Sequence, residues 1–361
     1  MLALPEAASS PARDPRVRVM VVDDSAIVRG LIVQTLERDP ALRVVARAAN
    51  GEAALIELAR TAVDVVVLDI EMPVMDGLTA LPLILKLHPE ARVVMASTLT
   101  RRNARISLQA LQAGAADYVP KPETGGLVGA DEFARELTAK VKALGGRGAT
   151  PTATTPAPAA PVIRPAALSP PVRPQVVAIG GSTGAPPALM SLFADLKGEL
   201  EQAVLLTQHM PPTFTAMLAE QLERAGGRPA AEARDGEPVL PGRIYVAPGG
   251  WHMTVGRSGQ VPVIRLNQEA PEHFCRPSVD PMLRSAAAVY GPGLLAVILT
   301  GMGSDGAEGC RAVAEAGGRF VVQDEATSVV WGMPGAAAKT GLAEAVLPLN
   351  QIAPWVRRAC A

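Results

Sequence analysis

Short apolar runs alternate with helix-length amphipathic stretches over most of the chain. In the first part, runs of strand length lie at residues 17–22, 42–48, 64–69, 92–96 and 117–119. Such alternation is typical of a parallel sheet with helices on both faces. It predicts a five-stranded, doubly wound α/β domain over residues 16–144.

The same alternation returns after residue 174. Further apolar runs lie at residues 176–180, 203–208, 243–247, 261–266, 294–299 and 319–322. They predict a second α/β domain over residues 175–358, with a mostly parallel sheet covered on both faces. Residues 145–174 are rich in Pro, Ala, Thr and Gly without periodicity, which predicts a partly extended linker. Residues 1–15 are expected to form a flexible tail.

Composition and charge exclude several classes of protein. The chain has 361 residues, 48% of them hydrophobic, and a net charge of -1, so it offers no positive field for nucleic acid. Its apolar runs are shorter than the roughly 18 to 20 residues that span a bilayer, and its N-terminus lacks the apolar core of a secretion signal. We expect a cytoplasmic protein without membrane insertion. Three widely spaced cysteines, Cys275, Cys310 and Cys360, indicate reduced thiols.

Acidic residues follow the apolar runs of the first domain. Asp23 and Asp24 come after the first run, and Asp69 ends the third. Three carboxylates at one sheet edge repel each other unless a hard cation such as Mg²⁺ neutralises them. Asp69 could then attack a phosphoryl group, with Lys121 adding positive charge and Ser97 a hydroxyl. Alternatively, the two N-terminal acids cap the next helix and Lys121 is a solvated loop residue.

Four segments together resemble the receiver domain of two-component response regulators over residues 16–142. They read VVDDSAIVRG, VLDIEMPVMDGL, VVMASTLT and DYVPKP. The resemblance implies that Asp69 is the phosphoacceptor and that Ser97, Tyr118 and Lys121 respond to phosphorylation. It also implies a magnesium site formed by Asp23, Asp24, Asp69 and the carbonyl of Glu71.

The second domain offers a candidate nucleophile in the segment IGGSTGAP. Ser182 ends a buried run inside a G-x-S-x-G pattern, where glycines permit a tight turn and a helix N-terminus offers free N-H groups to an oxyanion. A glycine-rich turn could equally cradle a phosphate, although the G-K-S/T ending of a nucleoside triphosphate site is missing.

A serine nucleophile needs a base and an acid. His209 ends the next apolar run and is the best base, whereas His252 and His273 could line a cleft or bond locally and His88 lies in the first domain. Asp305, beyond another buried run, is the best acid, although it could merely cap a helix. The rival acids are Asp280 and Asp324. The order Ser, His, Asp differs from that of α/β-hydrolases.

Five segments of the second domain resemble the catalytic domain of the chemotaxis protein-glutamate methylesterase (CheB) family. They read IGGSTGAP, QHMPPTFTAMLAEQL, APGGWHM, CRPSVDPML and LTGMGSDGA. The resemblance implies a cofactor-free hydrolysis of glutamyl methyl esters on chemoreceptors, with deamidation of receptor glutamines and phosphorylation of the receiver by a histidine kinase. Ser182, His209 and Asp305 would be catalytic, and the N-H groups near Thr183 and Met302 would bind the oxyanion. The usual A-S-T-G-G here reads Gly181 to Ala185, and Ala185 would resist a positive φ.

Two other classes stay open from the residues alone. One is a receiver joined to a non-enzymatic output module, which the absence of a helix-turn-helix pattern and of a Lys or Arg stripe disfavours. The other is a general serine peptidase or lipase.

Overall fold

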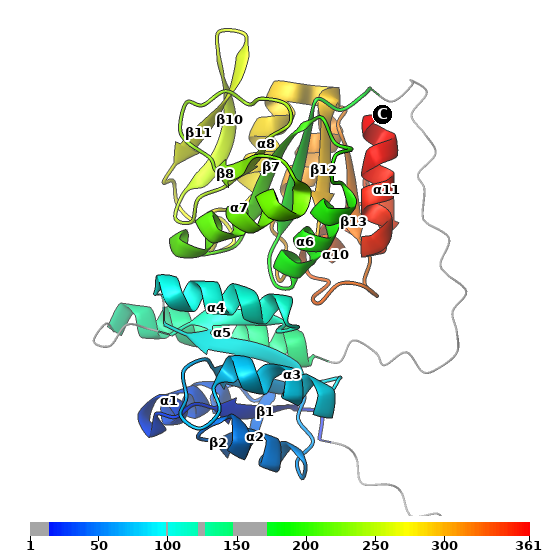
Figure 1. Ribbon diagram of the computed structural model, residues 1–361. Helices are drawn as coiled ribbons and strands as arrows, with labels where there is room; N and C mark the ends of the chain where they lie inside the picture. The colour runs from blue at the N-terminus through cyan, green and yellow to red at the C-terminus, as the bar shows by residue number, and fades with distance from the viewer. Residues whose placement is uncertain (1–13, 99, 122–126, 147–171) are drawn as a thin grey trace, which may run out of the picture.

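The computed structural model describes residues 14–98, 100–121, 127–146 and 172–361. These residues form two α/β domains, as the pattern of apolar runs predicts (Figure 1). Most of the expected linker and nearly all of the expected N-terminal tail lie outside the described residues. No helix among the described residues combines the length and apolar character needed to cross a membrane.

The N-terminal domain is built on a five-stranded parallel sheet with the order β2-β1-β3-β4-β5. Because the order changes direction between β1 and β3, the loops that follow these strands open a crevice at the carboxyl edge. The strands are β1 (Val17–Val22), β2 (Leu42–Ala48), β3 (Val65–Asp69), β4 (Arg92–Ser97) and β5 (Asp117–Pro120). The helices are α1 (Ala26–Glu37), α2 (Gly51–Leu58), α3 (Gly77–Leu87), α4 (Arg101–Gln112) and α5 (Leu127–Gly145).

Four of these helices begin at a polar side chain that accepts a backbone N-H from the first turn. The caps of α1 to α4 are Ser25, Asn50, Asp76 and Thr100. Ser25 therefore caps α1, and the alternative in which Asp23 or Asp24 serves only as its cap is not what the structure contains.

The C-terminal domain is built on a seven-stranded parallel sheet with the order β14-β13-β12-β6-β7-β9-β8. The order changes direction between β6 and β12. The strands are β6 (Val176–Gly181), β7 (Ala203–Gln208), β8 (Ala230–Glu232), β9 (Ile244–Val246), β12 (Leu294–Ile298), β13 (Arg319–Gln323) and β14 (Ala345–Leu347). The helices are α6 (Ala185–Asp195), α7 (Pro212–Gly226), α8 (Val279–Tyr290), α9 (Ala307–Glu315), α10 (Met333–Ala338) and α11 (Leu349–Cys360), with a 3-10 turn at Gly291–Gly293.

Helices cover both faces of this sheet. Val177 and Ile179 of β6 pack with residues of α6, α7 and α11, while Val176 and Ala178 pack with residues of α8, α9 and α10. One predicted strand lies elsewhere: residues 261–266 belong to β11 (Val261–Asn267), which forms a separate antiparallel hairpin with β10 (His252–Ser258).

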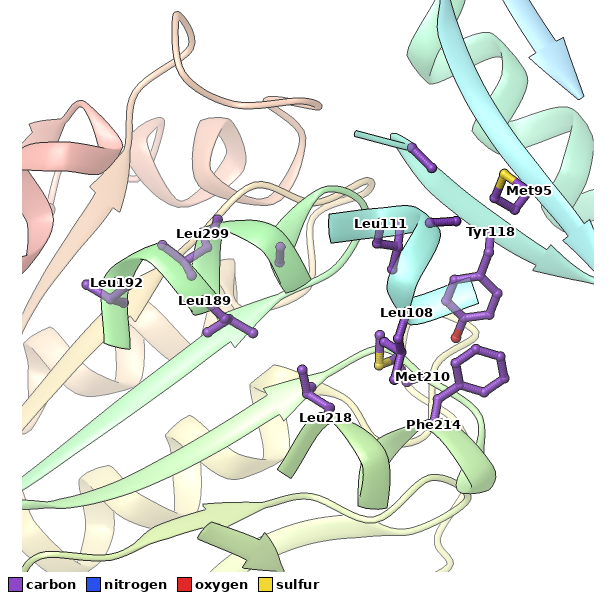
Figure 2. Packing of buried hydrophobic residues seen from close by; sticks show 14 of the residues in the cluster. Met95, Leu108, Leu111, Tyr118, Leu189, Leu192, Met210, Phe214, Leu218 and Leu299 are labelled. Carbon is purple, nitrogen blue, oxygen red and sulfur yellow. The ribbon is translucent and has the colours of Figure 1, made fainter. Parts of the chain in front are cut away.

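The two domains meet through the α4 and β5 side of the first and the α6 and α7 side of the second (Figure 1). Figure 2 shows Tyr118 of β5 against Phe214 of α7; their rings are stacked with centroids 4.3 Å apart. Both rings are buried, and one continuous apolar cluster extends from the first domain into the second. Beside this stack, the Thr183 hydroxyl donates a hydrogen bond of 2.5 Å to Asp117 of β5.

Candidate functional site

Three predicted side chains of the second domain come to one edge of its sheet. Ser182 directly follows β6, His209 directly follows β7, and Asp305 lies in the loop after β12. Gly181 pairs with Gln208 in the β6 and β7 register, so the nucleophile candidate and the base candidate leave neighbouring strands at the same level. The strand order also reverses between β6 and β12, and in open parallel sheets ligands bind at the carboxyl edge beside such a reversal.

The turn after β6 is fixed from two sides. The Ser182 N-H donates to the Thr300 carbonyl at 3.1 Å, and the Gln208 amide donates to the Ser182 carbonyl at 3.0 Å. Gly184 caps α6 with a φ of +78°, a conformation that favours glycine. A Cβ there would also lie 2.5 Å from Val329.

Asp305 is a buried carboxylate with four donors. It accepts hydrogen bonds from the N-H groups of Val279 at 2.7 Å and Asp280 at 2.9 Å, from the Ser278 hydroxyl at 2.8 Å, and from His209 at 2.7 Å. It therefore caps α8, not the helix that follows it in sequence. Burial alone raises its pKa, but the hydrogen bond from His209 and the backbone donors outweigh burial and lower the pKa of Asp305 to about 2.

The His209 imidazole is held through both ring nitrogens. Its Nε2 lies 2.7 Å from Asp305 Oδ2, and its Nδ1 lies 3.4 Å from the Cys275 thiol. An ionised carboxylate only accepts hydrogen bonds, so Nε2 carries a proton. Burial lowers the pKa of His209, but the neighbouring Cys275 and Asp305 outweigh it and raise the pKa to about 10.

The expected contact between the Ser182 hydroxyl and the imidazole is not formed. Within the described residues Ser182 Oγ makes no hydrogen bond to His209, and the nitrogen that could receive it faces Cys275 instead. Sequence reasoning treated Cys275 only as a reduced thiol. The available signal was its place three residues before Ser278, in the segment that also supplies two of the N-H donors to Asp305.

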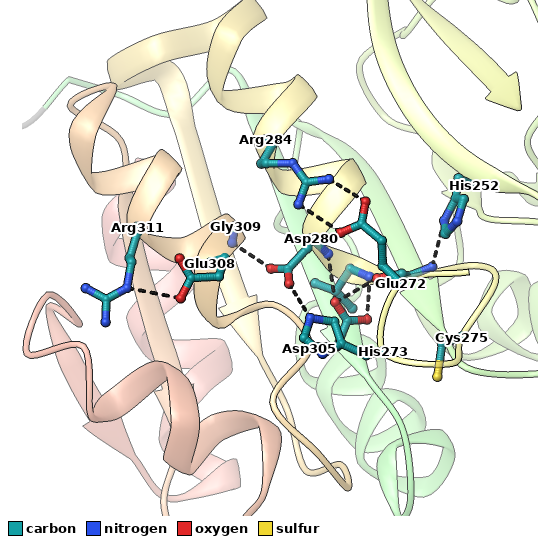
Figure 3. A network of polar contacts seen from close by, with 12 residues as sticks. His252, Glu272, His273, Cys275, Asp280, Arg284, Asp305, Glu308, Gly309 and Arg311 are labelled. Atoms are coloured by element: carbon teal, nitrogen blue, oxygen red, sulfur yellow. Dashed lines mark hydrogen bonds and ion pairs between the residues drawn. The ribbon is translucent and has the colours of Figure 1, made fainter. Parts of the chain in front are cut away.

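The rival histidines and acids have local roles. His252 is buried between the Ser278 N-H and the Ala270 carbonyl, and His88 contacts the Leu58 carbonyl. His273 Nε2 lies 2.9 Å from Asp280, which also accepts the Gly309 N-H of α9 at 2.6 Å (Figure 3). Asp324 binds the N-H and hydroxyl of Thr327 in an exposed turn.

The two predicted oxyanion donors lie beside the nucleophile candidate. Thr183 follows Ser182 directly, and Met302 follows Gly301, where a Cβ would come within 2.9 Å of the Ser182 Cβ. In the described part of the chain neither the Thr183 nor the Met302 N-H donates a hydrogen bond. Both N-H groups are therefore available to donate a hydrogen bond to an oxygen.

The predicted acidic pocket of the first domain is assembled at its crevice. Carboxylate oxygens of Asp23, Asp24 and Asp69 lie within 4.8 Å of one another, and Lys121 Nζ lies 2.7 Å from both Asp23 and Asp69. Burial raises the pKa of Asp69, while Lys121 opposes the shift. Converging carboxylates, one of them exposed, fit a hard divalent cation. The Glu71 side chain is exposed and pairs with Arg102 at 3.8 Å.

Ser97 and Tyr118 lie on neighbouring strands beyond this pocket. The Ser97 hydroxyl is buried and contacts the Ser107 hydroxyl at 3.1 Å, and the Lys121 N-H donates to the Ser97 carbonyl at 2.7 Å. Tyr118 points out of the domain toward Phe214.

This architecture defines a response regulator receiver joined to a hydrolase-type α/β domain. Residues 19–128 match the family model for the response regulator receiver domain, and residues 177–356 match the model for CheB methylesterase. The chain belongs to the protein-glutamate methylesterase/protein-glutamine glutaminase (CheB) family.

Similar proteins and a solved structure support this family assignment. The chain is 52% identical to the "protein-glutamate methylesterase/protein-glutamine glutaminase of group 2 operon" of Rhodospirillum centenum, over 98% of this chain and 96% of the relative. It is 52% identical to the protein-glutamate methylesterase/protein-glutamine glutaminase of Azospirillum brasilense, over 96% and 93%. The crystal structure of the Thermotoga maritima CheB methylesterase catalytic domain matches with a TM-score of 0.50 and 37% identity, covering 52% of this chain and 99% of that one.

The departure from the A-S-T-G-G pattern is explained by packing across the turn. A Cβ added at Gly181 would lie 2.5 Å from the Cβ of Ala185, so only one of the two positions has room for a methyl group. Ala185 is the first residue of α6 and needs no positive φ, because Gly184 provides it. The methyl group therefore lies at position 185 and not at position 181, and the strain expected at Ala185 is absent.

This packing predicts a coupled pair of substitutions. Gly181→Ala alone forces two Cβ atoms together and should lower the free energy of unfolding by about 1 to 3 kcal/mol. Adding Ala185→Gly should restore most of that loss, as measured by urea denaturation in a double-mutant cycle. Ala185→Gly alone is the control, and additive effects of the two changes would contradict this account of the turn.

Proposed function

We propose that the chain hydrolyses glutamate γ-methyl esters on chemoreceptors, releasing methanol under the control of receiver phosphorylation. The observation that carries the proposal is that Ser182, His209 and Asp305 follow strands at the same edge of the sheet, with the imidazole bonded to a buried carboxylate at 2.7 Å. The same chemistry would deamidate receptor glutamines, with ammonia as the leaving group. The family to which the chain belongs supports both activities.

In the proposed reaction the Ser182 oxygen attacks the ester carbonyl while His209 Nδ1 takes the hydroxyl proton. Nδ1 has this role because Nε2 is bonded to Asp305. The protonated imidazole then gives its proton to the departing methoxide, and methanol leaves. Water hydrolyses the acyl-enzyme by the reverse sequence of proton transfers, which returns the receptor carboxylate and free Ser182.

The Thr183 and Met302 N-H groups would stabilise the tetrahedral oxyanion, a contribution of about 3 to 4 kcal/mol per donor. For this reaction Ser182 has to replace the Cys275 thiol at Nδ1. The arrangement with Cys275 at that nitrogen and a strongly basic imidazole is therefore a resting one.

Control would start at Asp69, phosphorylated by a histidine kinase. The carboxylates of Asp23, Asp24 and Asp69 and the carbonyl of Glu71 would hold Mg²⁺, which neutralises charge on the phosphoryl oxygens. Lys121, now paired with Asp23 and Asp69, would face the phosphoryl group.

The contacts of β5 offer a route from this pocket to the nucleophile. Lys121 follows β5 directly, and the same strand carries Asp117 and Tyr118, which contact Thr183 and Phe214 of the other domain. A phosphoryl group that attracts Lys121 would displace the end of β5. Because Asp117 of β5 is hydrogen-bonded to Thr183, that displacement would reach the residue after Ser182. We infer that the unphosphorylated receiver restrains the active site, and that phosphorylation releases it.

Substitution of the nucleophile tests the chemistry. Ser182→Ala should reduce methanol release from methylated receptor membranes by about a thousandfold or more, because the base and oxyanion donors alone do not form an acyl-enzyme. Ser258→Ala, an exposed serine at the end of β10, is the matched control and should behave as the unchanged chain. Substantial methanol release from Ser182→Ala would refute the assignment.

Substitution of the phosphoacceptor tests the control. Asp69→Asn should keep its basal methanol release but lose the increase produced by a small-molecule phosphodonor with Mg²⁺, since the amide is not phosphorylated. Asp131→Asn on α5 removes an exposed carboxylate and should still respond. A full response in Asp69→Asn would show that control does not pass through this residue.

Substitution at the interface tests the coupling. Tyr118→Ala removes the stacked ring and should raise the basal activity of the unphosphorylated chain by about two- to tenfold, the range expected for an aromatic pair. Tyr118→Phe retains the ring and should stay at the basal level, because no hydrogen bond of the phenol is formed in the described structure. Equal activities of the two variants would contradict a restraining role for the stack.

A further inference from the structure

The Cys275 thiol belongs to a row of three side chains. Its sulfur lies 3.4 Å from His209 Nδ1, and the opposite ring nitrogen lies 2.7 Å from the buried carboxylate of Asp305. Thiol, imidazole and carboxylate thus stand in the order used by cysteine nucleophiles, at the same histidine that the proposed esterase reaction assigns to Ser182.

The turn that presents Cys275 is firmly built. His273 and Phe274 have φ values of 52° and 63°, a left-handed conformation that is uncommon for residues other than glycine. The Cys275 N-H donates to the Glu272 carbonyl at 2.8 Å, and the Glu272 carboxylate pairs with Arg284 of α8. His273 Nε2 lies 2.9 Å from Asp280 on the same helix, so Glu272 and His273 together attach the N-terminal side of the turn to α8 (Figure 3).

The three cysteines differ sharply in surroundings. Cys310 and Cys360 are buried at 0% and 4% exposure, whereas Cys275 is partly exposed beside the imidazole. A thiol within hydrogen-bond distance of an imidazole can pass its proton to the ring and leave a nucleophilic thiolate. Accessible thiolates next to a basic residue react readily with peroxides.

We propose that Cys275 is a modification site, oxidised by hydrogen peroxide to a sulfenic acid, and that this oxidation switches the esterase off. The thiolate attacks one peroxide oxygen, an S-O bond forms, the O-O bond breaks, and hydroxide leaves. Hydroxide takes the proton that the thiol gave to His209 and becomes water, so the thiol and peroxide give sulfenic acid and water.

The sulfenic acid hydroxyl then binds His209 Nδ1 more strongly than the weak S-H donor that it replaces, so Ser182 no longer displaces it. This nitrogen is the one left for Ser182, since Nε2 is bonded to Asp305, so the oxidised enzyme lacks a free base. The inhibition rests on the proposed esterase function; the oxidation itself does not. The neighbouring Phe274 ring lies under the Arg135 guanidinium of the receiver at 5.2 Å, so the turn also borders the domain interface.

The experiment treats the full chain with hydrogen peroxide and dimedone and maps adducts by peptide mass spectrometry. We expect the adduct at Cys275 in at least about tenfold excess over Cys310 and Cys360, and a several-fold slower reaction at Cys275 in the His209→Gln variant. Equal labelling of the three thiols, or unchanged labelling in a His209→Gln protein with a native circular dichroism spectrum, would overturn the proposal.

Methanol release gives the second readout, each protein being compared with its own untreated sample. Peroxide should abolish most of the activity of the unchanged chain and dithiothreitol should restore it, whereas Cys275→Ser should keep its activity. Equal peroxide sensitivity of the two proteins would contradict the switch. If peroxide and dimedone label Cys275 preferentially but the chain releases no methanol even before treatment, the reactive thiol is upheld and the proposed esterase function is rejected.

Discussion

The buried carboxylate of Asp305 fixes the geometry of the second domain's site. A charge of this kind is costly to remove from water unless donors compensate for it. Here the N-terminus of α8 supplies two N-H groups and the Ser278 hydroxyl, and the imidazole supplies the fourth donor. Asp280 in the first turn of α8 reciprocally accepts an N-H of α9. The two helices and the intervening loop therefore hold the acid, and the acid holds His209.

One consequence concerns the two nitrogens of the imidazole. Because Nε2 is bonded to Asp305, every proton transfer at this site has to use Nδ1. In the proposed reaction the Ser182 hydroxyl would therefore compete with the Cys275 thiol for a single atom, and in the structure the thiol lies 3.4 Å from that atom. On this proposal, the state of the enzyme would depend on which of the two side chains reaches Nδ1.

The sequence predicted the fold class and the position of the acids well, because buried strands give continuous apolar runs and their carboxyl ends meet at one edge. The strands β8 and β14, of three residues each, were not predicted, whereas β9 of the same length lies within a longer apolar run and was. The pairing of residues 261–266 with β10 in a separate hairpin was missed, since a strand's partner is not encoded in its own periodicity. The contact of Cys275 with His209 joins residues 66 positions apart. It depends on a left-handed turn at His273 and Phe274, where no glycine in the sequence indicates such a turn.

The domain interface combines an aromatic stack, which contributes affinity, with a hydrogen bond, which fixes the relative position of the two domains. The stacked rings of Tyr118 and Phe214 bury apolar surface, which tolerates small displacements because dispersion is weakly directional. The hydrogen bond from Thr183 to Asp117 is directional and is anchored on the receiver side by Lys140, 3.1 Å from the same carboxylate. Since Thr183 adjoins Ser182 and its N-H is a candidate oxyanion donor, a small shift of β5 changes the turn that must present both groups. The proposed control at this interface would therefore require no unfolding of either domain, only the loss of one buried hydrogen bond and of the stack beside it.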